Sequence, residues 1–345
     1  MSCYRVGVIG TGRVSGPIDD TIRPHSDWKA PYGHVTAYQQ APDTEVVAAA
    51  DVDEEILSAW CSRYGVAHGY ADYREMIEKE QLDIVSVTTR TEARAEPILF
   101  AANHGMRGIY AEKALCASTD ELAAIADRCR RNKVALEYGP MRRFYAGYQK
   151  AHDVLASGTL GAPRAILTPS YELFNGVSHL IDEALYLLDD PRPAYVCAEL
   201  ESAVTTHVDG ELVVTGDPFV RFAVVQFQSG ERMIVTDLGP GEFQVTCEEG
   251  LIHSSGDSER WVMRRFKKMG LENETEISFS GVSGTVAKIR DLIESIESGE
   301  PGLSNLDLAV KGMEICFAMV VSHHMNGARV EFPFDTRVRM IDSRM

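Results

Sequence analysis

The chain has 345 residues, of which 45% are hydrophobic and 25% are charged, a balance typical of globular proteins rather than of disordered or fibrous ones. Its length exceeds that of one ordinary domain and fits two. The formal net charge of −17 argues against a nucleic-acid partner, because phosphate binding needs a basic surface.

Seven cysteines lie far apart and include no Cys-x-x-Cys pair. We expect reduced thiols, as in cytoplasmic proteins, rather than a disulfide framework or a zinc site. The chain shows no basic start followed by an apolar targeting run, and no stretch approaches the roughly 20 apolar residues that span a bilayer. The expected location is the cytoplasm, without a membrane partner.

The first expected strand runs from Tyr4 to Ile9, and it is followed by Gly10-Thr11-Gly12-Arg13-Val14-Ser15. A strand that leads into G-x-G-x-x-small is the fingerprint of dinucleotide binding. Gly10 would permit the tight turn, and Gly12 would let the backbone approach a pyrophosphate. The match alone is weak, because glycines often only form turns.

A second apolar segment, from Glu45 to Ala50, ends at Asp51. An acidic residue at this strand end can accept hydrogen bonds from the hydroxyls of the adenosine ribose. Val52 and Asp53 follow, without an arginine to meet a 2′-phosphate, so NAD is favoured over NADP. The alternative for Asp51 is an ordinary carboxylate at the end of a strand.

The distance from Gly12 to Asp51 is wider than the usual spacing of about 20 residues. The excess is a segment over about 16–33, which contains His25 and Trp28, and the next helix is expected to begin near His34. Because the insertion would lie beside the cofactor, it is either a lid or wall of the substrate site or a surface loop.

Strands and helices then alternate up to residue 138. We expect helices over 54–64, 73–80, 92–103 and 118–132, and strands over 83–88, 108–111 and 134–138. The strands named so far are five of the six that, with the intervening helices, we expect to form a doubly wound parallel sheet. Lys113 follows the fifth strand, at the edge where such sheets bind ligands. Its alternative role is an ion pair with Glu112.

The pattern changes after residue 140. A helix over about 145–156 and a strand over 163–172 precede a helix that begins at Asn175 and contains His179. Short apolar runs separated by glycine and polar turns extend over about 194–252, which is typical of a half-buried antiparallel sheet. Helices over about 282–298 and 306–325 and a short strand over 329–332 complete the chain.

In order and spacing, these features resemble the Gfo/Idh/MocA oxidoreductases, named for glucose–fructose oxidoreductase, inositol dehydrogenase and a rhizopine-catabolism protein. The resemblance extends from the first strand to the last. It rests on the Gly10/Gly12 turn, Asp51, Glu112-Lys113, Arg142-Arg143-Phe144, Gly158-Thr159-Leu160-Gly161, His179-Leu180-Ile181-Asp182 and Arg329-Val330-Glu331-Phe332-Pro333. No single motif is decisive.

The resemblance implies an NAD(P)-binding Rossmann domain over 1–140 and an α/β domain over 141–345 with an open, mostly antiparallel sheet. The second domain would bind substrate and join copies into a homodimer or homotetramer through its sheet. Members of the family typically oxidise or reduce a ring hydroxyl of a sugar, cyclitol or sugar derivative with NAD(P).

The family's Glu-Lys-Pro and Asp-x-x-x-His motifs place a catalytic lysine at Lys113 and an acid/base histidine at His179. His179 is expected in the first turn of its helix, where the helix dipole disfavours the imidazolium. The expected substrate contacts are Asn175, Arg142 and Arg143. The expected cofactor contacts are Gly10, Thr11, Gly12, Arg13, Val14, Asp51, Val52, Thr88, Thr89, Glu112 and Lys113.

Two positions depart from the family's pattern. Ala114 replaces the proline after the lysine, so a rigid or cis turn is not implied. Asn175 replaces the aspartate, which removes a negative charge that would support a protonated imidazole. Either the acid/base step is weaker, or another residue shares it, with Tyr171 and Glu172 the nearest in sequence.

Simpler alternatives exist for the remaining assignments. Arg142 and Arg143 bind an acidic sugar or only pair with surface carboxylates. His179 and Asp182, one helical turn apart, can form a local pair, and without a third ligand in view no metal site is expected. The rival function for the whole chain is a non-catalytic sensor that binds NAD or a sugar.

Overall fold

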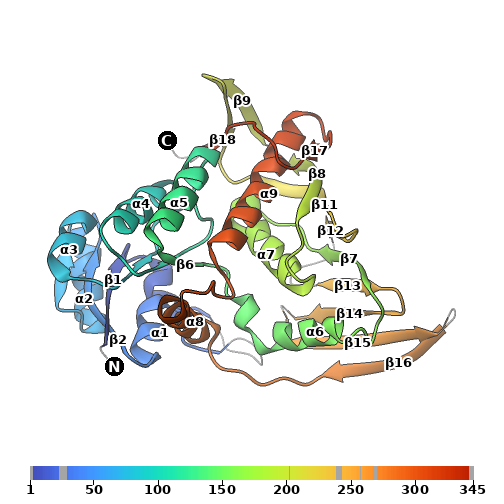
Figure 1. Cartoon of the computed structure of the whole chain (residues 1–345), viewed down its shortest axis with the longest axis horizontal. Coiled ribbons are helices and arrows are strands. Elements are labelled where there is room, and N and C mark those ends of the chain that lie inside the picture. The colour runs from blue at the N-terminus through green and yellow to red at the C-terminus, as the bar shows by residue number, and fades with distance from the viewer. Residues whose placement is uncertain are drawn as a thin grey trace.

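The computed structural model describes residues 3–22, 29–201, 203–237, 243–256, 258–267 and 270–341. Within them the chain forms two parts that lie side by side (Figure 1). One part surrounds a six-stranded sheet and the other a nine-stranded sheet. His25 and Trp28 of the insertion lie outside the described residues.

The first part is a sheet of six parallel strands in the order β3-β2-β1-β4-β5-β6. The strands are β1 (Tyr4–Ile9), β2 (Thr44–Ala50), β3 (His68–Tyr70), β4 (Ile84–Val87), β5 (Gly108–Ala111) and β6 (Ala135–Tyr138). The helices are α1 (His34–Gln40), α2 (Glu54–Tyr64), α3 (Tyr73–Glu80), α4 (Ala95–Asn103) and α5 (Thr119–Asn132). The strand order reverses between β1 and β4, which is the doubly wound topology. The predicted Rossmann sheet is confirmed.

Local chemistry explains where these elements begin and why they pack. All four residues of β4 are buried, as expected for a central parallel strand with helices on both faces. Helix α5 begins after Ser118, whose hydroxyl accepts a hydrogen bond from the backbone nitrogen of Glu121 (3.1 Å). The Glu121 carboxylate in turn accepts one from the backbone nitrogen of Ala117 (2.8 Å). The first bond satisfies an amide that the first helical turn leaves free, and the second ties the residue before the cap to that turn.

The second part is a nine-stranded sheet in the order β16-β15-β14-β13-β7-β12-β11-β8-β17. All neighbouring pairs are antiparallel except β7 and β12. Its strands are β7 (Pro163–Thr168), β8 (Pro193–Glu201), β11 (Phe219–Phe227), β12 (Arg232–Val235), β13 (Gln244–Cys247), β14 (Gly250–Ser255), β15 (Arg260–Lys267), β16 (Gly270–Ile277) and β17 (Val330–Glu331). The predicted mostly antiparallel sheet is confirmed.

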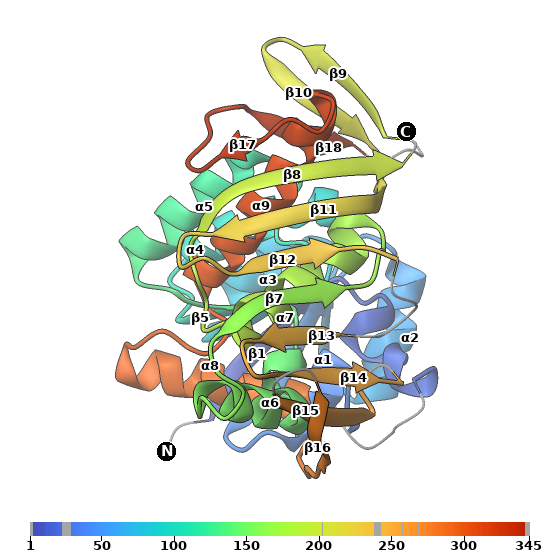
Figure 2. The same cartoon turned by 90° about the vertical axis from the view of Figure 1, so that its right-hand side faces the viewer.

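The helices of the second part cover one face of this sheet. They are α6 (Ala146–Ala156), α7 (Ser178–Leu187) and α9 (Leu306–His324), and α9 packs directly against β8. Figure 2 looks onto the other face, over which none of the described helices lies. A hairpin of β9 (Val204–Val208) and β10 (Glu211–Thr215) stands at one end, where β18 (Val338–Ile341) pairs with β10.

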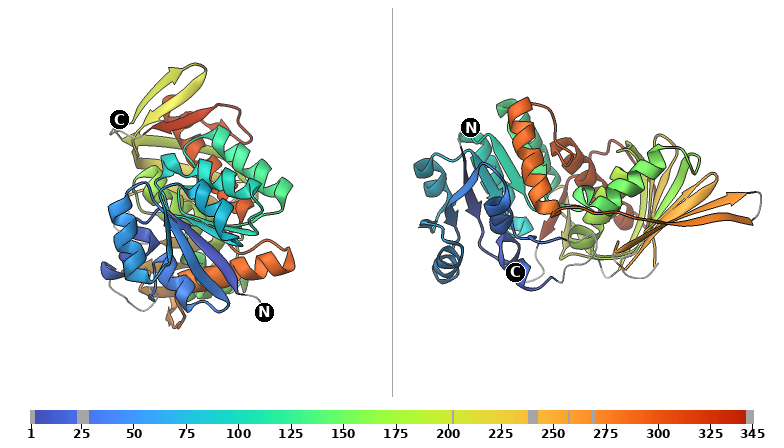
Figure 3. Two further views of the ribbon diagram at one scale, coloured as in Figure 1. Left: turned by 90° about the vertical axis from the view of Figure 1, so that its left-hand side faces the viewer. Right: turned by 90° about the horizontal axis from the view of Figure 1, so that it is seen from below.

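One helix of the second half completes the core of the first part. Helix α8 (Gly284–Ser298) packs against α1, β5 and β6 (Figure 3). Its Ile289 and Leu292 are fully buried in a cluster that includes Tyr38 and Tyr110. The sequence pattern places the domain boundary at residue 140. A later segment of the chain, α8, nevertheless packs on the Rossmann sheet.

The described ends of the insertion are tied to each other near the start of α1. The carboxylate of Asp19 accepts hydrogen bonds from the backbone nitrogens of Tyr32 (2.6 Å) and Gly33 (3.1 Å). The hydroxyl of Ser283, just before α8, donates to the carbonyl of Pro31 (2.5 Å). Helix α1 begins at His34, as the sequence predicts.

The largest local difference from the predicted elements lies between β7 and α7. The strand expected over 163–172 ends at Thr168, and residues Leu173–Val177 form a turn of π-helix, η5, that leads into α7. Strand β18 was not predicted either, because its partner β10 is far away in sequence. No described helix is long and apolar enough to cross a membrane.

Candidate active site

The ends of five parallel strands lie in one row at the carboxyl edge of the first sheet. The pairing register aligns Ile9 with Ala50 and Val87, Val87 with Ala111, and Ala111 with Tyr138. The residues that follow these strand ends are therefore neighbours, namely Gly10, Asp51, Thr88, Glu112 and Gly139. Four of the five were predicted as cofactor contacts, and the fold brings all four together.

The glycine turn leaves its backbone accessible. Gly10 has φ of +89°, and an added Cβ would lie 3.0 Å from the backbone nitrogen of Thr89, so glycine is required there. An added Cβ at Gly12 would meet no described atom within 4 Å. Residues Arg13–Ser15 then form a short 3-10 turn, η1. The open side of Gly12 fits the close approach of a pyrophosphate.

Asp51 lies against this turn. Its Oδ2 accepts hydrogen bonds from the backbone nitrogen (2.7 Å) and the hydroxyl (2.9 Å) of Thr11. Its Oδ1 accepts one from the backbone nitrogen of Asp53 (3.1 Å). Because a carboxylate offers about four acceptor positions, Asp51 retains room for a ribose hydroxyl. Val52 beside it is 92% exposed. The residues present therefore fit a dinucleotide.

Glu112 is buried and holds the backbone of Lys113. Its Oε1 lies 3.1 Å from Nε2 of His34, whose Nδ1 lies 2.5 Å from the hydroxyl of Ser86. Its Oε2 accepts a hydrogen bond from the backbone nitrogen of Lys113 (3.2 Å). Burial raises the pKa of Glu112, but His34 and the charge of Lys113 outweigh burial and lower it to about 2. Glu112 is therefore an ionised internal anchor.

The side chain of Lys113, from the first part, contacts the second part. Its Nζ donates hydrogen bonds to the main-chain oxygen of Asn175 (2.9 Å) and to the side-chain Oδ1 of the same residue. The peptide bond between Lys113 and Ala114 is cis. The side chain of Lys113 thus binds Asn175 rather than forming the alternative ion pair with Glu112.

His179 follows one turn after Asn175, in α7. Burial lowers the pKa of His179 well below its ordinary value, and the charges of Lys113 and Arg142 act in the same direction. Its Nδ1 is buried and has no hydrogen-bond partner among the described residues. The expected dipole effect is not the main cause, because η5 extends the helical path upstream of His179. Burial keeps the imidazole neutral.

A pocket of about 210 Å³ opens at these side chains, between η5, α7 and the turn before α6. It is lined by Arg142, Tyr171, Glu172, Asn175, Gly176, His179 and Leu180. Nη1 of Arg142 donates to both carboxylate oxygens of Glu183 (2.9 and 3.1 Å). Burial raises the pKa of Glu183 to about 7. Three predicted site residues thus line one pocket, and Lys113 reaches it through Asn175.

Arg143 does not reach this pocket. Its side chain is fully buried, and Nε donates to Asp182 (2.8 Å) while Nη1 and Nη2 donate to Asp190 (3.0 and 2.8 Å). A side chain enclosed in this way has no surface for a substrate. We therefore replace the expected substrate contact of Arg143 with a structural role. Asp182 is its internal counter-ion, not a partner of His179.

Replacing Arg143 with alanine should destabilise the fold by about 3–5 kcal/mol, because Asp182 would become a buried charge without compensation. The free energy of unfolding in urea measures this loss. Arg164→Ala is the matched control, since its partner Glu248 is exposed and such pairs contribute about 0–1 kcal/mol. A stable Arg143→Ala variant with only a raised KM would contradict the structural role.

Sequence patterns gave no sign of two further residues at the site. Asp217, in the turn between β10 and β11, accepts hydrogen bonds from the backbone nitrogens of Phe174 (2.7 Å) and Asn175 (2.9 Å). Buried Arg94 donates to the carbonyls of Thr89 and Ala114 and so joins two strand ends. An Asp-Pro pair is an ordinary turn signal and an arginine at a helix start is unremarkable, so only the fold reveals both contacts.

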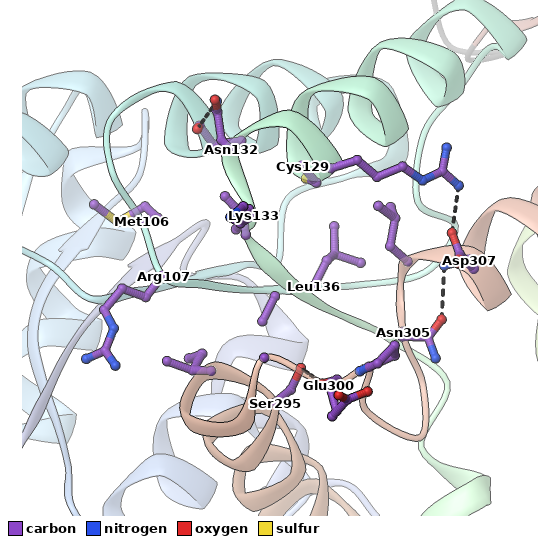
Figure 4. A pocket seen from close by; sticks show the side chains of 18 of the residues that line it. Met106, Arg107, Cys129, Asn132, Lys133, Leu136, Ser295, Glu300, Asn305 and Asp307 are labelled. Atoms are coloured by element: carbon purple, nitrogen blue, oxygen red, sulfur yellow. Dashed lines mark hydrogen bonds and ion pairs between the residues drawn. The ribbon is translucent and has the colours of Figure 1, made fainter.

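A larger pocket, of about 1080 Å³, lies away from these residues (Figure 4). Its walls come from the starts of β5 and β6 and the ends of α4, α5 and α8, at the edge of the sheet opposite to Lys113. Polar groups there pair with each other, as Arg130 does with Asp307 (2.6 Å). The larger of the two pockets is therefore not the one next to the candidate catalytic residues.

Comparisons with known proteins agree with this arrangement. Residues 4–139 match the Gfo/Idh/MocA description "Oxidoreductase family, NAD-binding Rossmann fold". The chain is 24% identical over 245 residues to the myo-inositol 2-dehydrogenase of Thermotoga maritima, covering 67% of each chain. It is 33% identical over 123 residues to the "D-xylose 1-dehydrogenase (NADP(+)) 2" of Haloferax volcanii, covering 36% of this chain and 37% of that enzyme.

The fold of both halves also occurs in a solved structure. The structure of levoglucosan dehydrogenase in complex with NADH and L-sorbose aligns with a TM-score of 0.76 at 16% identity, covering 97% of this chain and 100% of that one. The Thermotoga alignment, at 245 residues, is longer than the matched Rossmann segment. Residues 4–139 thus match the Gfo/Idh/MocA family of NAD-binding oxidoreductases, and the fold of the whole chain is similar to that of solved oxidoreductases.

Proposed function

We propose that this protein is an NAD-dependent dehydrogenase that transfers a hydride between a ring secondary alcohol and nicotinamide. The substrate class is a sugar, a cyclitol or a sugar derivative. The observation that carries the proposal is the meeting of Lys113, Asn175 and His179 at one pocket, next to a strand edge that fits a dinucleotide. The relatives named for inositol and xylose oxidation and the sugar-bound neighbour support this class.

Oxidation of the alcohol removes a hydride from carbon and a proton from the hydroxyl. Bound NAD supplies the hydride acceptor. Neutral His179 would take the hydroxyl proton, and its buried Nδ1 shows that the imidazole has unused hydrogen-bonding capacity. Lys113 would donate a hydrogen bond to the same oxygen and stabilise the negative charge that develops on it. In the reverse direction, His179 would return the proton.

The pocket favours a small substrate. Its volume of about 210 Å³ lies below the ~300–1,000 Å³ of typical sites for drug-sized ligands, which suits one sugar ring. Arg142 enters the pocket already paired with Glu183, so its charge is compensated before substrate binds. This pairing favours a neutral polyol over an acidic sugar.

We also propose that copies of the chain pair through the uncovered face of the nine-stranded sheet (Figure 2). Three apolar residues on strands β11, β15 and β16 are exposed, namely Phe222 (43%), Phe266 (40%) and Leu271 (58%). Burial of these side chains against a second copy would be favourable through the hydrophobic effect. Light scattering would report a dimer or tetramer, and a monomer at micromolar concentration would contradict the pairing.

Asp51→Asn should reduce the preference for NAD over NADP by about tenfold or more. The amide can still accept a hydrogen bond from Thr11, but it no longer repels a 2′-phosphate. Fluorescence titration with NADH and NADPH gives both Kd values. Asp53→Asn is the control, because asparagine also caps the start of α2 well. An unchanged NADH-to-NADPH ratio in Asp51→Asn would contradict the role of Asp51.

The proposed function is tested by NAD and NADP reduction across a panel of sugars, cyclitols, sugar acids and glycosides. Turnover with one substrate class, lost in Lys113→Ala and His179→Ala, is the expected result. NADH binding without turnover of any panel member would favour the rival, a sensor that binds the nucleotide. Asn175, in place of the family's aspartate, is the observation behind that rival.

A further inference from the structure

This inference rests on the proposed function and concerns how Lys113 is held. We propose that Asp217 is a positioning residue of the active site. Its carboxylate binds the turn that carries Asn175, the residue that contacts Lys113. Asp217 thereby supplies a negative charge near Lys113, which the neutral Asn175 lacks.

Asp217 binds the start of η5 from the neighbouring strand connection. Its two carboxylate oxygens accept hydrogen bonds from the consecutive backbone nitrogens of Phe174 and Asn175 (2.7 and 2.9 Å). The carbonyl of Pro218 accepts the next one upstream, from the nitrogen of Leu173 (2.9 Å). Amides at the start of a helical turn have no partner within the turn, so this connection satisfies three of them in sequence.

The same contacts orient the main-chain oxygen and the Oδ1 of Asn175. With its nitrogen held by Asp217, both its main-chain oxygen and its Oδ1 accept hydrogen bonds from Nζ of Lys113. These two acceptors are neutral. A neutral amide therefore occupies the position of the family's carboxylate, and a carboxylate lies directly behind it.

The charges around Lys113 show why this arrangement matters. Burial lowers the pKa of Lys113; Glu112 and Asp217 raise it, and Arg94 and Arg13 lower it further. The ionisable groups that face Lys113 from the surrounding elements are Arg13 from the glycine turn, Arg94 from the start of α4, Glu112 from the end of β5, His179 from α7 and Asp217. Glu112, from the first half, is also bound to His34. Asp217 contributes a negative charge from the second half.

The first test uses the protein without cofactor or substrate, so it does not depend on the proposed activity. The rate at which acetic anhydride modifies Lys113, followed by mass spectrometry against pH, gives the midpoint of its deprotonation. In Asp217→Asn this midpoint should move to lower pH, because a neighbouring negative charge is lost. Exposed Lys79 in the same sample is the internal reference.

Two further variants separate charge from fold. Asp209→Asn, in the exposed turn between β9 and β10, should leave the midpoint of Lys113 unchanged. Adding Asn175→Asp to Asp217→Asn should move the midpoint back to higher pH, because a carboxylate then lies beside Lys113. An unchanged midpoint in Asp217→Asn, or a shift that Asn175→Asp does not reverse, would overturn the inference.

With an active wild-type enzyme, Asp217→Asn should lower kcat on the order of 10–100-fold, because misplaced catalytic groups cost rate even without direct loss of contact. The Kd for NADH should not change, since Asp217 lies in the second half. Loss of turnover without the shift in the Lys113 midpoint would assign Asp217 a structural role only. An inactive wild-type protein would instead reject the proposed function and leave the labelling result to decide on Asp217.

Discussion

Lys113→Ala should reduce kcat/KM on the order of 10²–10³-fold, the effect of removing one preorganised donor to a developing oxyanion. The loss should appear mainly in kcat, because Lys113 acts most strongly when negative charge forms on the substrate oxygen. The Kd for NADH should stay within about twofold of the wild-type value, since the glycine turn and Asp51 remain intact. Steady-state kinetics and fluorescence titration of the same preparations measure both quantities.

Lys150→Ala is the matched control for this variant. Lys150 is an exposed lysine in α6 that pairs with neighbouring Asp153, so its loss should leave kcat/KM unchanged. If Lys113→Ala retained turnover close to that of Lys150→Ala, Lys113 would be a link between the two halves of the protein and not a catalytic group.

His179→Asn should reduce kcat by 10²–10⁴-fold, as expected for the loss of a general acid/base. In the wild-type enzyme, the pH profile follows from the direction of the pKa shift. Because the pKa of His179 lies well below its ordinary value, the neutral base persists as pH falls through about 6.5. Activity should therefore decline only at lower pH. On the alkaline side its decline should be centred below the ordinary lysine pKa of about 10.4, because burial lowers the pKa of Lys113.

The measurement is kcat/KM against pH for the wild type, His179→Asn and the control His104→Asn. His104 lies exposed at the end of α4, where asparagine is well tolerated, so this variant should keep the wild-type profile. An acidic limb centred at or above pH 6.5 would show that His179 titrates as an ordinary histidine, and the burial argument would be wrong.

The first half of the fold follows from local sequence patterns. Apolar runs that end at Gly10, Asp51 and Lys113 define strands, and capping residues such as Ser118 define helix starts. Because parallel strands align at one edge, these patterns also place the predicted cofactor residues next to one another. The prediction of an open antiparallel sheet in the second half was likewise confirmed.

Features that depend on contacts between distant segments were not predictable in the same way. The π turn before His179 is bound by Asp217, which lies in another strand connection and accepts a hydrogen bond from an amide of the turn. Arg143 resembles a substrate ligand in sequence, but Asp182 and Asp190 enclose it after folding. The contact of α8 with the Rossmann sheet and the pairing of β18 with β10 also join segments that are remote in sequence.

The central claim is hydride transfer from a ring carbon to nicotinamide, and an isotope experiment tests it most directly. The panel substrate with the highest turnover would be prepared with deuterium on the carbon that is oxidised and incubated with the protein and NAD. We predict reduced cofactor that carries one deuterium, detected by mass spectrometry, at a rate that Lys113→Ala and His179→Asn each lower on the order of 10²-fold or more. Reduced cofactor without deuterium, or formation at the wild-type rate in both variants, would contradict the claim.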